Sequence, residues 1–366
     1  MKKNAPQAPK PPVEPMLARL AEELPAGDFL YEPKWDGFRA IVFRSASDVY
    51  IQSRDLRPLD RYFPELHEAF LAQVPPGSVA DGEIVIVTGS GLDFDSLQLR
   101  LHPAASRVAK LAKETPASFV AFDLLAVDDG DVCGLPQAER RALLERLLSK
   151  AKPPVHLTPV TRNHQLAVDW LARFEGAGLD GVVAKPLSGT YQPGKRAMIK
   201  VKHQRTADCV VAGFRWYKGA QGAVGSLLLG LYDNAGTLQH VGVTSAFSLE
   251  TRKKLAAELA PLRKDAIDDH PWREWAGANG TNGVRMPGGQ SRWSAGKDLS
   301  WEPLRIERVC EVKYDHLQGD RFRHATLFLR WRADKRPQDC RYDQLEVTTP
   351  YELENVFGAT GRERRP

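Results

Sequence analysis

Short apolar runs, rich in β-branched and aromatic residues, alternate with polar segments through the first two hundred positions. They predict strands over residues 29–31, 39–44, 49–52, 83–87, 119–122 and 182–184. Apolar residues at helical spacing predict helices over residues 59–74, 136–150 and 165–175. Strands and helices do not alternate regularly, so the pattern predicts an α+β domain with antiparallel pairing.

From residue 207 the alternating runs become longer. Strands are expected over residues 209–216, 226–232, 239–244, 308–314 and 325–331, with a helix over residues 248–259. Ser248 suits the N-cap of that helix. Five strands with a helix between the third and fourth give the order of an OB-fold barrel, so this second domain is expected to be an all-β barrel with one helix. Residues 277–296, rich in Gly, Asn and Ser, predict a long loop.

The chain of 366 residues exceeds the usual size of one domain. We expect a disordered proline-rich lead over residues 1–15, a first domain over 16–204, an OB-fold domain over 205–350 and a tail over 351–366. No apolar run is long enough to span a membrane, and no signal-peptide core follows the first methionine. The four cysteines are dispersed, which argues against disulfides and zinc, so a cytoplasmic location is expected.

The formal net charge of +5 is too small to indicate a nucleic-acid partner by itself. Two basic clusters are more informative because aromatic residues accompany the second, as in surfaces that bind a phosphate backbone. They are Lys195, Arg196, Lys200, Lys202 and Arg205, and then Arg321, Arg323, Arg330, Arg332, Lys335 and Arg336 with Phe322, Phe328 and Trp331. The alternative is that both are solvated strand faces.

One segment, residues 32–39, carries a candidate nucleophile. Lys34 follows a predicted strand and precedes another, so a loop could point it into a cleft, and Gly37 would permit a tight turn. An amine attacks phosphorus only when it is unprotonated, which requires a nearby cation such as Arg39 or a bound metal. The alternative is an exposed lysine in a polar turn.

Further elements follow in order, each ordinary by itself. They are Ser53-Arg54, Asp81-Gly82-Glu83-Ile84, Phe122, Asp180-Gly181-Val182-Val183-Ala184-Lys185, Met198-Ile199-Lys200-Val201-Lys202 and Arg332-Ala333-Asp334-Lys335. Lys200 and Lys202 lie two apart on one strand face and could share a phosphate. Asp180 and Lys185 fall on opposite faces by simple alternation, unless the strand is kinked near Gly181.

In this order and spacing the segments resemble the motifs of the covalent nucleotidyltransferases: ATP-dependent DNA ligases, RNA ligases and mRNA capping enzymes. The chain is most similar to the short bacterial DNA ligase C group. The resemblance implies an ATP-grasp-like antiparallel nucleotidyltransferase (adenylation) domain followed by the OB-fold domain. One departure is Asp180, where many members carry glutamate.

The resemblance also implies roles for individual residues. Catalytic residues would be Lys34, which becomes linked to AMP, together with Lys200, Lys202, Arg332, Asp334 and Lys335. The nucleotide would be bound by Glu32, Lys34, Arg39, Arg54, Glu83, Phe122, Lys185, Lys200 and Lys202, and Mg²⁺ or Mn²⁺ by Glu83 and Asp180. Glu32 and Phe122 would select adenine, and the segment from Arg332 to Lys335 would orient the pyrophosphate in the first step.

The implied activity is sealing of nicks in duplex DNA, in repair and recombination, by a monomer at the bacterial nucleoid. A primase-polymerase or a Ku-type protein would be the partner. The loop over 277–296, with Arg285, Arg292, Trp293 and Lys297 nearby, is expected to contact DNA. Alternatives are an RNA ligase, a capping guanylyltransferase, or a non-catalytic OB-type DNA-binding protein, against which the intact lysines argue.

Overall fold

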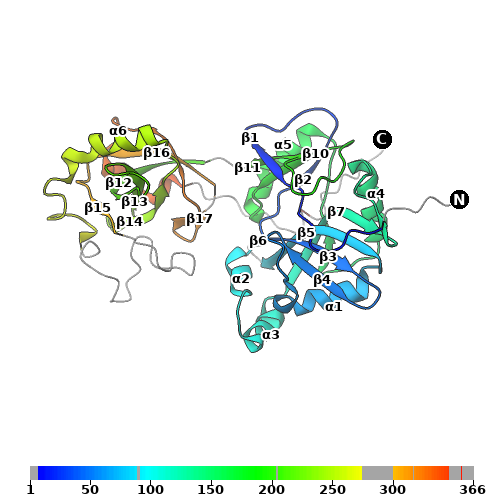
Figure 1. Ribbon diagram of the computed structural model, residues 1–366. Helices are drawn as coiled ribbons and strands as arrows, with labels where there is room; N and C mark the ends of the chain where they lie inside the picture. The colour runs from blue at the N-terminus through cyan, green and yellow to red at the C-terminus, as the bar shows by residue number, and fades with distance from the viewer. Residues whose placement is uncertain are drawn as a thin grey trace. The chain divides into compact units, whose positions relative to one another are not determined.

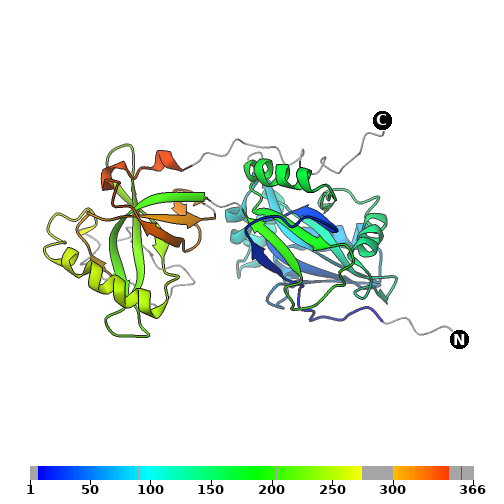
Figure 2. The ribbon, with the colours of Figure 1, turned by 90° about the horizontal axis from the view of Figure 1, so that it is seen from above.

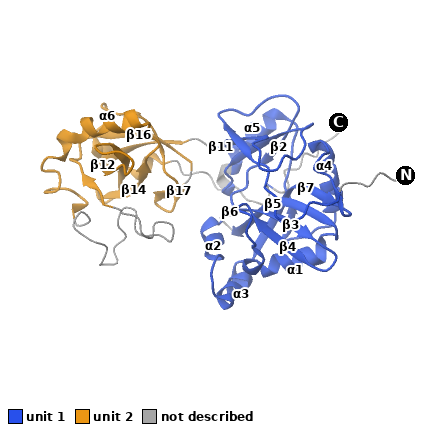
Figure 3. Cartoon of the chain, in the orientation of Figure 1, with its two compact units in different colours: residues 1–203, 348–366 blue, residues 204–347 orange. Residues whose placement is uncertain are grey.

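The computed structural model describes residues 7–88, 91–202, 205–273, 300–315, 317–345 and 356. The chain divides into two compact units, residues 1–203 with 348–366 (unit 1) and residues 204–347 (unit 2), coloured separately in Figure 3. This division falls one residue from the boundary expected between the two domains. Val356, from the expected tail, is buried in a core of unit 1.

Unit 1 contains two sheets. The smaller has the order β1 (Ala18–Ala21), β11 (Met198–Lys202), β10 (Gly181–Pro186) and β2 (Phe29–Pro33). The larger has the order β4 (Val49–Ser53), β3 (Phe38–Arg44), β5 (Ser78–Thr88), β7 (Ala117–Val127) and β8 (Gly130–Asp131), with β6 (Gly91–Leu92) on β5 and β9 (Val155–Leu157) on β7. Neighbours pair antiparallel except β1 with β11 and β7 with β9. Strands β2 and β3 are consecutive yet belong to different sheets, so residues 34–37 connect the two sheets (Figure 1).

Five α-helices and two 3₁₀ turns are described in unit 1. They are α1 (Pro64–Gln73), α2 (Phe94–Leu99), α3 (Ala105–Glu114), α4 (Gln137–Leu147), α5 (His164–Arg173), η1 (Asp60–Tyr62) and η2 (Phe174–Ala177). The helix expected over 59–74 is divided, because Pro64 starts a new helix at its first turn. Helices α2 and α3 were not predicted. Helix α5 packs on β10 and β2 of the smaller sheet (Figure 2).

Residues 7–15 make defined contacts with unit 1, which the expected disordered lead would not make. Gln7 bridges to Gly130, and the Val13 amide donates a hydrogen bond of 2.9 Å to Oε1 of Gln52. The Gln52 side chain donates in return to the carbonyl of Val13. Apolar and backbone contacts with unit 1 therefore outweigh the proline-rich composition of residues 7–15.

Unit 2 has the strand order predicted for an OB fold. Its elements are β12 (Arg205–Trp216), β13 (Val224–Tyr232), β14 (Leu238–Thr244), α6 (Leu249–Leu259), η3 (Ala260–Arg263), β15 (Glu302–Pro303), β16 (Val309–Tyr314), β17 (Leu317–Gln318), β18 (Arg321–Phe322), β19 (Leu327–Trp331), η4 (Pro337–Asp339) and η5 (Tyr342–Gln344). The main sheet runs β14-β13-β12-β16-β19, and register shifts between β12 and β13 help it to curl. Oγ of Ser248 accepts a hydrogen bond of 3.2 Å from the amide of Thr251, which confirms the predicted cap.

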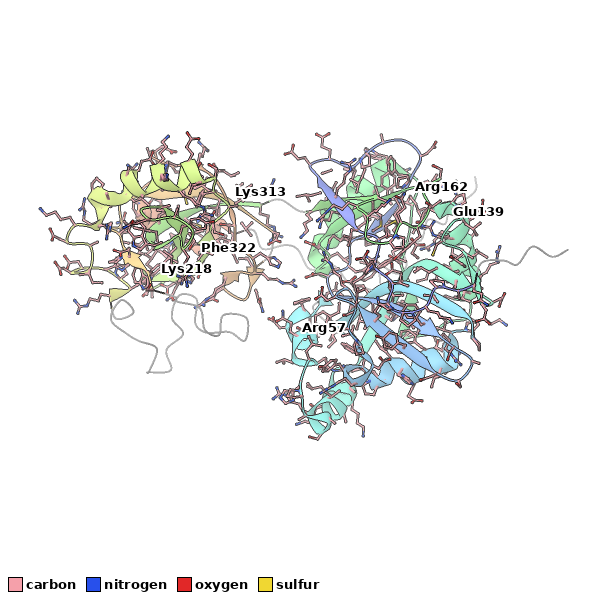
Figure 4. All side chains as sticks on the ribbon, viewed as in Figure 1. Arg57, Glu139, Arg162, Lys218, Lys313 and Phe322 are labelled. Atoms are coloured by element: carbon pink, nitrogen blue, oxygen red, sulfur yellow. The ribbon has the colours of Figure 1, made fainter. Side chains whose placement is uncertain are left out.

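A single core fills unit 2, and Phe322 of β18, labelled in Figure 4, belongs to it. The expected DNA-contacting loop, with Arg285, Arg292, Trp293 and Lys297, lies outside the described residues. None of the helices in the described part of the chain combines the length and the apolar character needed to cross a membrane.

We expect Glu65→Ala to destabilise unit 1 by about 3 kcal/mol, because it leaves a buried guanidinium without its carboxylate. Arg100 is fully buried and donates to both carboxylate oxygens of Glu65, at 2.7 and 2.8 Å. Hydrogen exchange at the β7 amides measures unit 1 separately from unit 2. Glu68→Ala, an exposed change on the same helix, is the control. Equal protection in the two variants would contradict the prediction.

Candidate active site

The loop that connects the two sheets is held rigidly around Lys34. Trp35 is 4% exposed, and its Nε1 donates a hydrogen bond of 2.8 Å to Oγ1 of Thr158. A Cβ on Gly37 would overlap the carbonyl oxygen of Ile84 on β5. Gly37 does not adopt a left-handed backbone, so a positive φ is not the reason for glycine at this bend. It is glycine because the loop backbone lies directly against a strand.

The backbone of Lys34 is bonded to the start of β10. Its N–H donates to the carbonyl of Gly181 at 2.8 Å, and its carbonyl accepts from the N–H of Asp180 at 2.9 Å. Gly181 has φ = 135°, and a Cβ there would overlap the carbonyl oxygen of Val201 on β11. The backbone irregularity expected near Gly181 is therefore present, and it fixes the nucleophile candidate against the motif that contains Asp180.

Two lysine side chains share the carboxylate of Asp180. Oδ2 of Asp180 lies 2.5 Å from Nζ of Lys34 and 2.9 Å from Nζ of Lys202. Lys200 stands on the same strand as Lys202, and its pKa is lowered, first by burial and then by the positive charges of Lys34 and Lys202. Among the described residues, no carboxylate forms an ion pair with Lys200. This end of the site thus holds more positive than negative charge, which suits a phosphate group.

A cavity opens between the two sheets, and seven of the residues expected to bind the nucleotide line it. They are Glu32, Lys34, Arg39, Arg54, Glu83, Phe122 and Lys200. The remaining lining residues are mostly apolar: Pro15, Leu17, Ala18, Pro33, Trp35, Val183 and Met198. These positions lie up to 185 residues apart in the sequence, so the fold brings them together.

Glu83 stands at the polar side of this cavity. Its Oε1 accepts a hydrogen bond of 3.1 Å from the N–H of Gly37. Burial raises the pKa of Glu83 to about 7, despite the opposing charges of Arg39 and Lys34. Its carboxylate is therefore incompletely compensated by the protein and would be stabilised by a cation.

Another residue of the cavity lining, Glu32, has a buried oxygen without a hydrogen-bond partner among the described residues. Glu32 is 4% exposed, and its Oε1 lies 2.7 Å from Nζ of Lys185. Its other oxygen, Oε2, is buried and has no hydrogen-bond partner among the described residues. A buried acceptor without a donor is costly, so this oxygen is suited to accept from a ligand N–H. The Phe122 ring lies beside it in the cavity lining.

Lys185 does not line this cavity, contrary to the expectation that it holds sugar and phosphate. It is 1% exposed, and its Nζ donates to the carbonyl of Phe122 at 2.9 Å while lying between the carboxylates of Glu32 and Asp123. Two carboxylates bind its charge more favourably than an open cavity would. Lys185 therefore fixes the position of Glu32, which itself lines the cavity.

Lys185 belongs to a buried ionic network that the sequence did not predict. Arg140, fully buried on α4, donates to Asp123 at 2.8 and 3.1 Å and to Oε1 of Gln137 at 2.5 Å. Although burial raises the pKa of Asp123, the charges of Lys185 and Arg140 lower it overall. The available signal was an aspartate inside the apolar run 119–126, since such residues are rarely buried unless paired.

A second missed group joins the N-terminal segment to the cavity. Arg39 donates to both oxygens of Asp81, at 2.5 and 2.6 Å, and to the carbonyl of Met16 at 3.2 Å. The Tyr191 hydroxyl donates to Asp81 at 2.6 Å and accepts from the N–H of Met16 at 3.1 Å. Pro15 and Leu17 line the cavity, so this network fixes the position of the segment that forms one wall of the cavity.

The remaining expected catalytic residues lie in unit 2 and form a compact ionic group. Arg332 donates to both oxygens of Asp208, at 2.9 and 3.0 Å, and pairs with Asp334 at 2.8 Å. Lys335 donates to Asp208 at 2.8 Å. Asp208 was not predicted, although it lies in β12, the first strand of unit 2. In the described ranges of both units, no group of three or more His, Cys, Asp or Glu side chains is arranged to hold a metal.

A lysine in a cavity between two antiparallel sheets, in a chain that continues into an OB fold, is the arrangement of a nucleotidyltransferase. Comparisons with known proteins narrow the class. Residues 15–202 match the ATP dependent DNA ligase domain, and residues 220–335 match the ATP dependent DNA ligase C terminal region. The chain belongs to the ATP-dependent DNA ligase family.

Individual relatives agree with the family matches. The chain is 56% identical over 338 residues to DNA ligase C2 of Mycolicibacterium smegmatis, covering 92% of this chain and 95% of that protein. It is 52% identical over 352 residues to DNA ligase C of Mycobacterium tuberculosis, covering 94% and 97%. A solved structure of a Lig E DNA ligase covers 87% of this chain and 99% of its own, with a TM-score of 0.55 and 18% identity, and shows the shared fold. The predicted fold, the similarity to the DNA ligase C group, the ligase activity and the use of ATP are confirmed, and the RNA ligase, capping and non-catalytic alternatives are disfavoured.

Removal of the Tyr191 hydroxyl should weaken the attachment of the N-terminal segment that lines the cavity. In Tyr191→Phe the Met16 amide loses its acceptor and Asp81 loses a donor, a cost of about 1 kcal/mol, so the KM for ATP should rise about fivefold. Self-adenylation at varied ATP concentration measures this. Tyr50→Phe, which removes a hydroxyl from β4, is the matched control. A fall in rate at saturating ATP with an unchanged KM would show that the network does not shape the nucleotide cavity.

Proposed function

We propose that this DNA ligase works through a covalent AMP on Lys34. The neutral Nζ attacks the α-phosphorus of ATP, an N–P bond forms, and the P–O bond to pyrophosphate breaks. The observation that carries the proposal is the convergence of Lys34, Arg39, Arg54, Glu83, Phe122 and Lys200 on one cavity. AMP then passes to the 5′-phosphate of a nick, and the 3′-hydroxyl attacks that phosphate and expels AMP.

The ion pair between Lys34 and Asp180 has to open before the attack. An ammonium has no lone pair, and Nζ of Lys34 lies 2.5 Å from Oδ2 of Asp180, which would hold it away from the phosphorus. Lys202 already bonds the same oxygen of Asp180, so it can retain this carboxylate when Lys34 loses its proton. Lys34 is thus held in an ion pair with Asp180, and it becomes available for attack when a change in the charges of the site breaks that pair.

A divalent cation fits the donor set of this site. Glu83 and Asp180 would hold it together with phosphate oxygens of ATP, since Mg²⁺ is usually bound by one or two carboxylates plus phosphates. The incompletely compensated carboxylate of Glu83 is the observation that supports this assignment. When bound, such a cation neutralises charge on the phosphates and competes with Lys34 for Asp180.

Base selection is assigned to Glu32 and Phe122. The unpartnered Oε2 of Glu32 suits the exocyclic amine of adenine, whereas guanine offers a carbonyl oxygen at the equivalent position. The Phe122 ring offers a stacking surface. Lys185 and Asp123 hold Glu32 so that its second oxygen stays directed at the base.

The biological setting is part of the proposal. We propose that this chain acts in DNA repair and recombination at the bacterial nucleoid, because an enzyme that seals nicks acts after breaks have been trimmed and filled. We propose that it acts as a monomer on nicked duplex DNA, with a primase-polymerase or a Ku-type protein supplying the ends.

The first test removes the nucleophile. Lys34→Ala should abolish labelling by α-labelled ATP and sealing of ordinary nicks, while a chemically pre-adenylated nick is still sealed, because only the first two steps need the lysine–AMP bond. Intact mass spectrometry of the wild type should show an AMP adduct. Lys113→Ala, an exposed lysine on α3, is the control. Normal labelling of Lys34→Ala would refute the assignment.

The second test changes residues of unit 2 and compares the effect on self-adenylation with the effect on sealing. Lys335→Ala and Asp334→Ala should slow self-adenylation by about 10²-fold, as expected for loss of a group that stabilises the leaving pyrophosphate. Sealing of a pre-adenylated nick, which involves no pyrophosphate, should change much less. Single-turnover assays of both steps measure the difference. Equal losses in both steps would assign these residues a structural role.

A further inference from the structure

Asp208 is the centre of the ionic group in unit 2. It is 8% exposed, and its two oxygens accept from Nη1 of Arg332 at 2.9 and 3.0 Å, while Oδ2 also accepts from Nζ of Lys335 at 2.8 Å. The group contains two cations and, with Asp334, two carboxylates. It is therefore neutral within itself, although only Asp208 contacts both cations.

The backbone of Asp208 is anchored on both sides. Its N–H donates to Oε1 of Gln344 at 2.7 Å, and its carbonyl accepts from Nε2 of the same side chain at 3.0 Å. Asp208 also pairs with Glu311 in the register of β12 and β16. A carboxylate fixed this way can set the positions of the cations bound to it.

Arg332 and Lys335 are engaged to different degrees. Nη1 of Arg332 is directed at Asp208, and Nε and Nη2 are directed at Asp334. The guanidinium therefore has little capacity left for a ligand. Among the described residues, Nζ of Lys335 makes one hydrogen bond, to Asp208, so two of its three protons remain for a phosphate.

We propose that Asp208 is a positioning residue for the first step of the reaction, holding Lys335 as the phosphate donor while Arg332 serves as a fixed strut between Asp208 and Asp334. The inference rests on the proposed function, in which the segment from Arg332 to Lys335 acts on the pyrophosphate. It assigns a role to a residue outside that segment.

A double-mutant cycle between Asp208 and Lys335 tests the proposal. Asp208→Asn keeps the size of the side chain and removes its charge. It should slow self-adenylation about tenfold, and in a Lys335→Ala background it should slow it hardly further, because both changes remove one coupled function. Sealing of a pre-adenylated nick should stay within about twofold of wild type in the same assay set.

Controls separate positioning from stability. Asp233→Asn removes another hydrogen-bonded aspartate of unit 2, in the β13–β14 turn, and should leave self-adenylation unchanged. If Asp208→Asn does not fold, Asp208→Glu keeps the carboxylate and enters the same cycle. Multiplicative effects in the cycle, or equal losses in both steps, would overturn the proposal. Failure of wild-type protein to label with ATP would instead overturn the lysine–AMP function on which it rests.

Discussion

The attachment of the Lys34 loop to the start of β10 is the constraint on which the site depends. Two backbone hydrogen bonds join Lys34 to Asp180 and Gly181, and the side chains of Lys34 and Asp180 meet at the same point. Because residues 34–37 are also the connection between the two sheets, this attachment fixes the sheets relative to the nucleophile. The cavity exists because that loop is pinned, and the glycines at 37 and 181 allow the backbones to approach closely enough.

Charge in unit 1 is arranged in two groups with different purposes. Lys34, Lys200 and Lys202 lie around the carboxylate of Asp180, which pairs with Lys34 and Lys202, so positive charge gathers where phosphate is expected. The second group is balanced, because buried Lys185 and Arg140 are matched by Glu32 and Asp123. An unbalanced group can respond to a ligand, whereas a balanced one holds geometry. In unit 2, Arg332 is bonded to both Asp208 and Asp334, whereas among the described residues Lys335 is bonded to Asp208 alone.

The sequence predicted the residues that line the cavity better than the residues that hold them in place. Lys34, Glu83 and Lys200 could be found because their segments follow each other in a recognisable order, and the OB fold followed from strand alternation. Helix α2 was missed because it has only six residues, and helix α3 because most of its apolar residues are alanines. Lys185 was misplaced and Asp208, Asp81 and Tyr191 were overlooked, because a side chain's partner lies far along the chain and periodicity carries no information about it. The N-terminal wall was missed because proline-rich composition resembles disorder until its contacts are known.

The parallel pairing of β1 with β11 joins the beginning of unit 1 to its end. Lys34 leaves the ribosome early, but Asp180, Lys200 and the strand that closes the cavity are synthesised well over a hundred residues later. The nucleotide site therefore cannot assemble on a nascent chain until β11 has emerged. The proposed AMP on Lys34 would thus mark a chain whose first unit is complete, because a nascent chain that ends before β11 lacks residues that line the cavity.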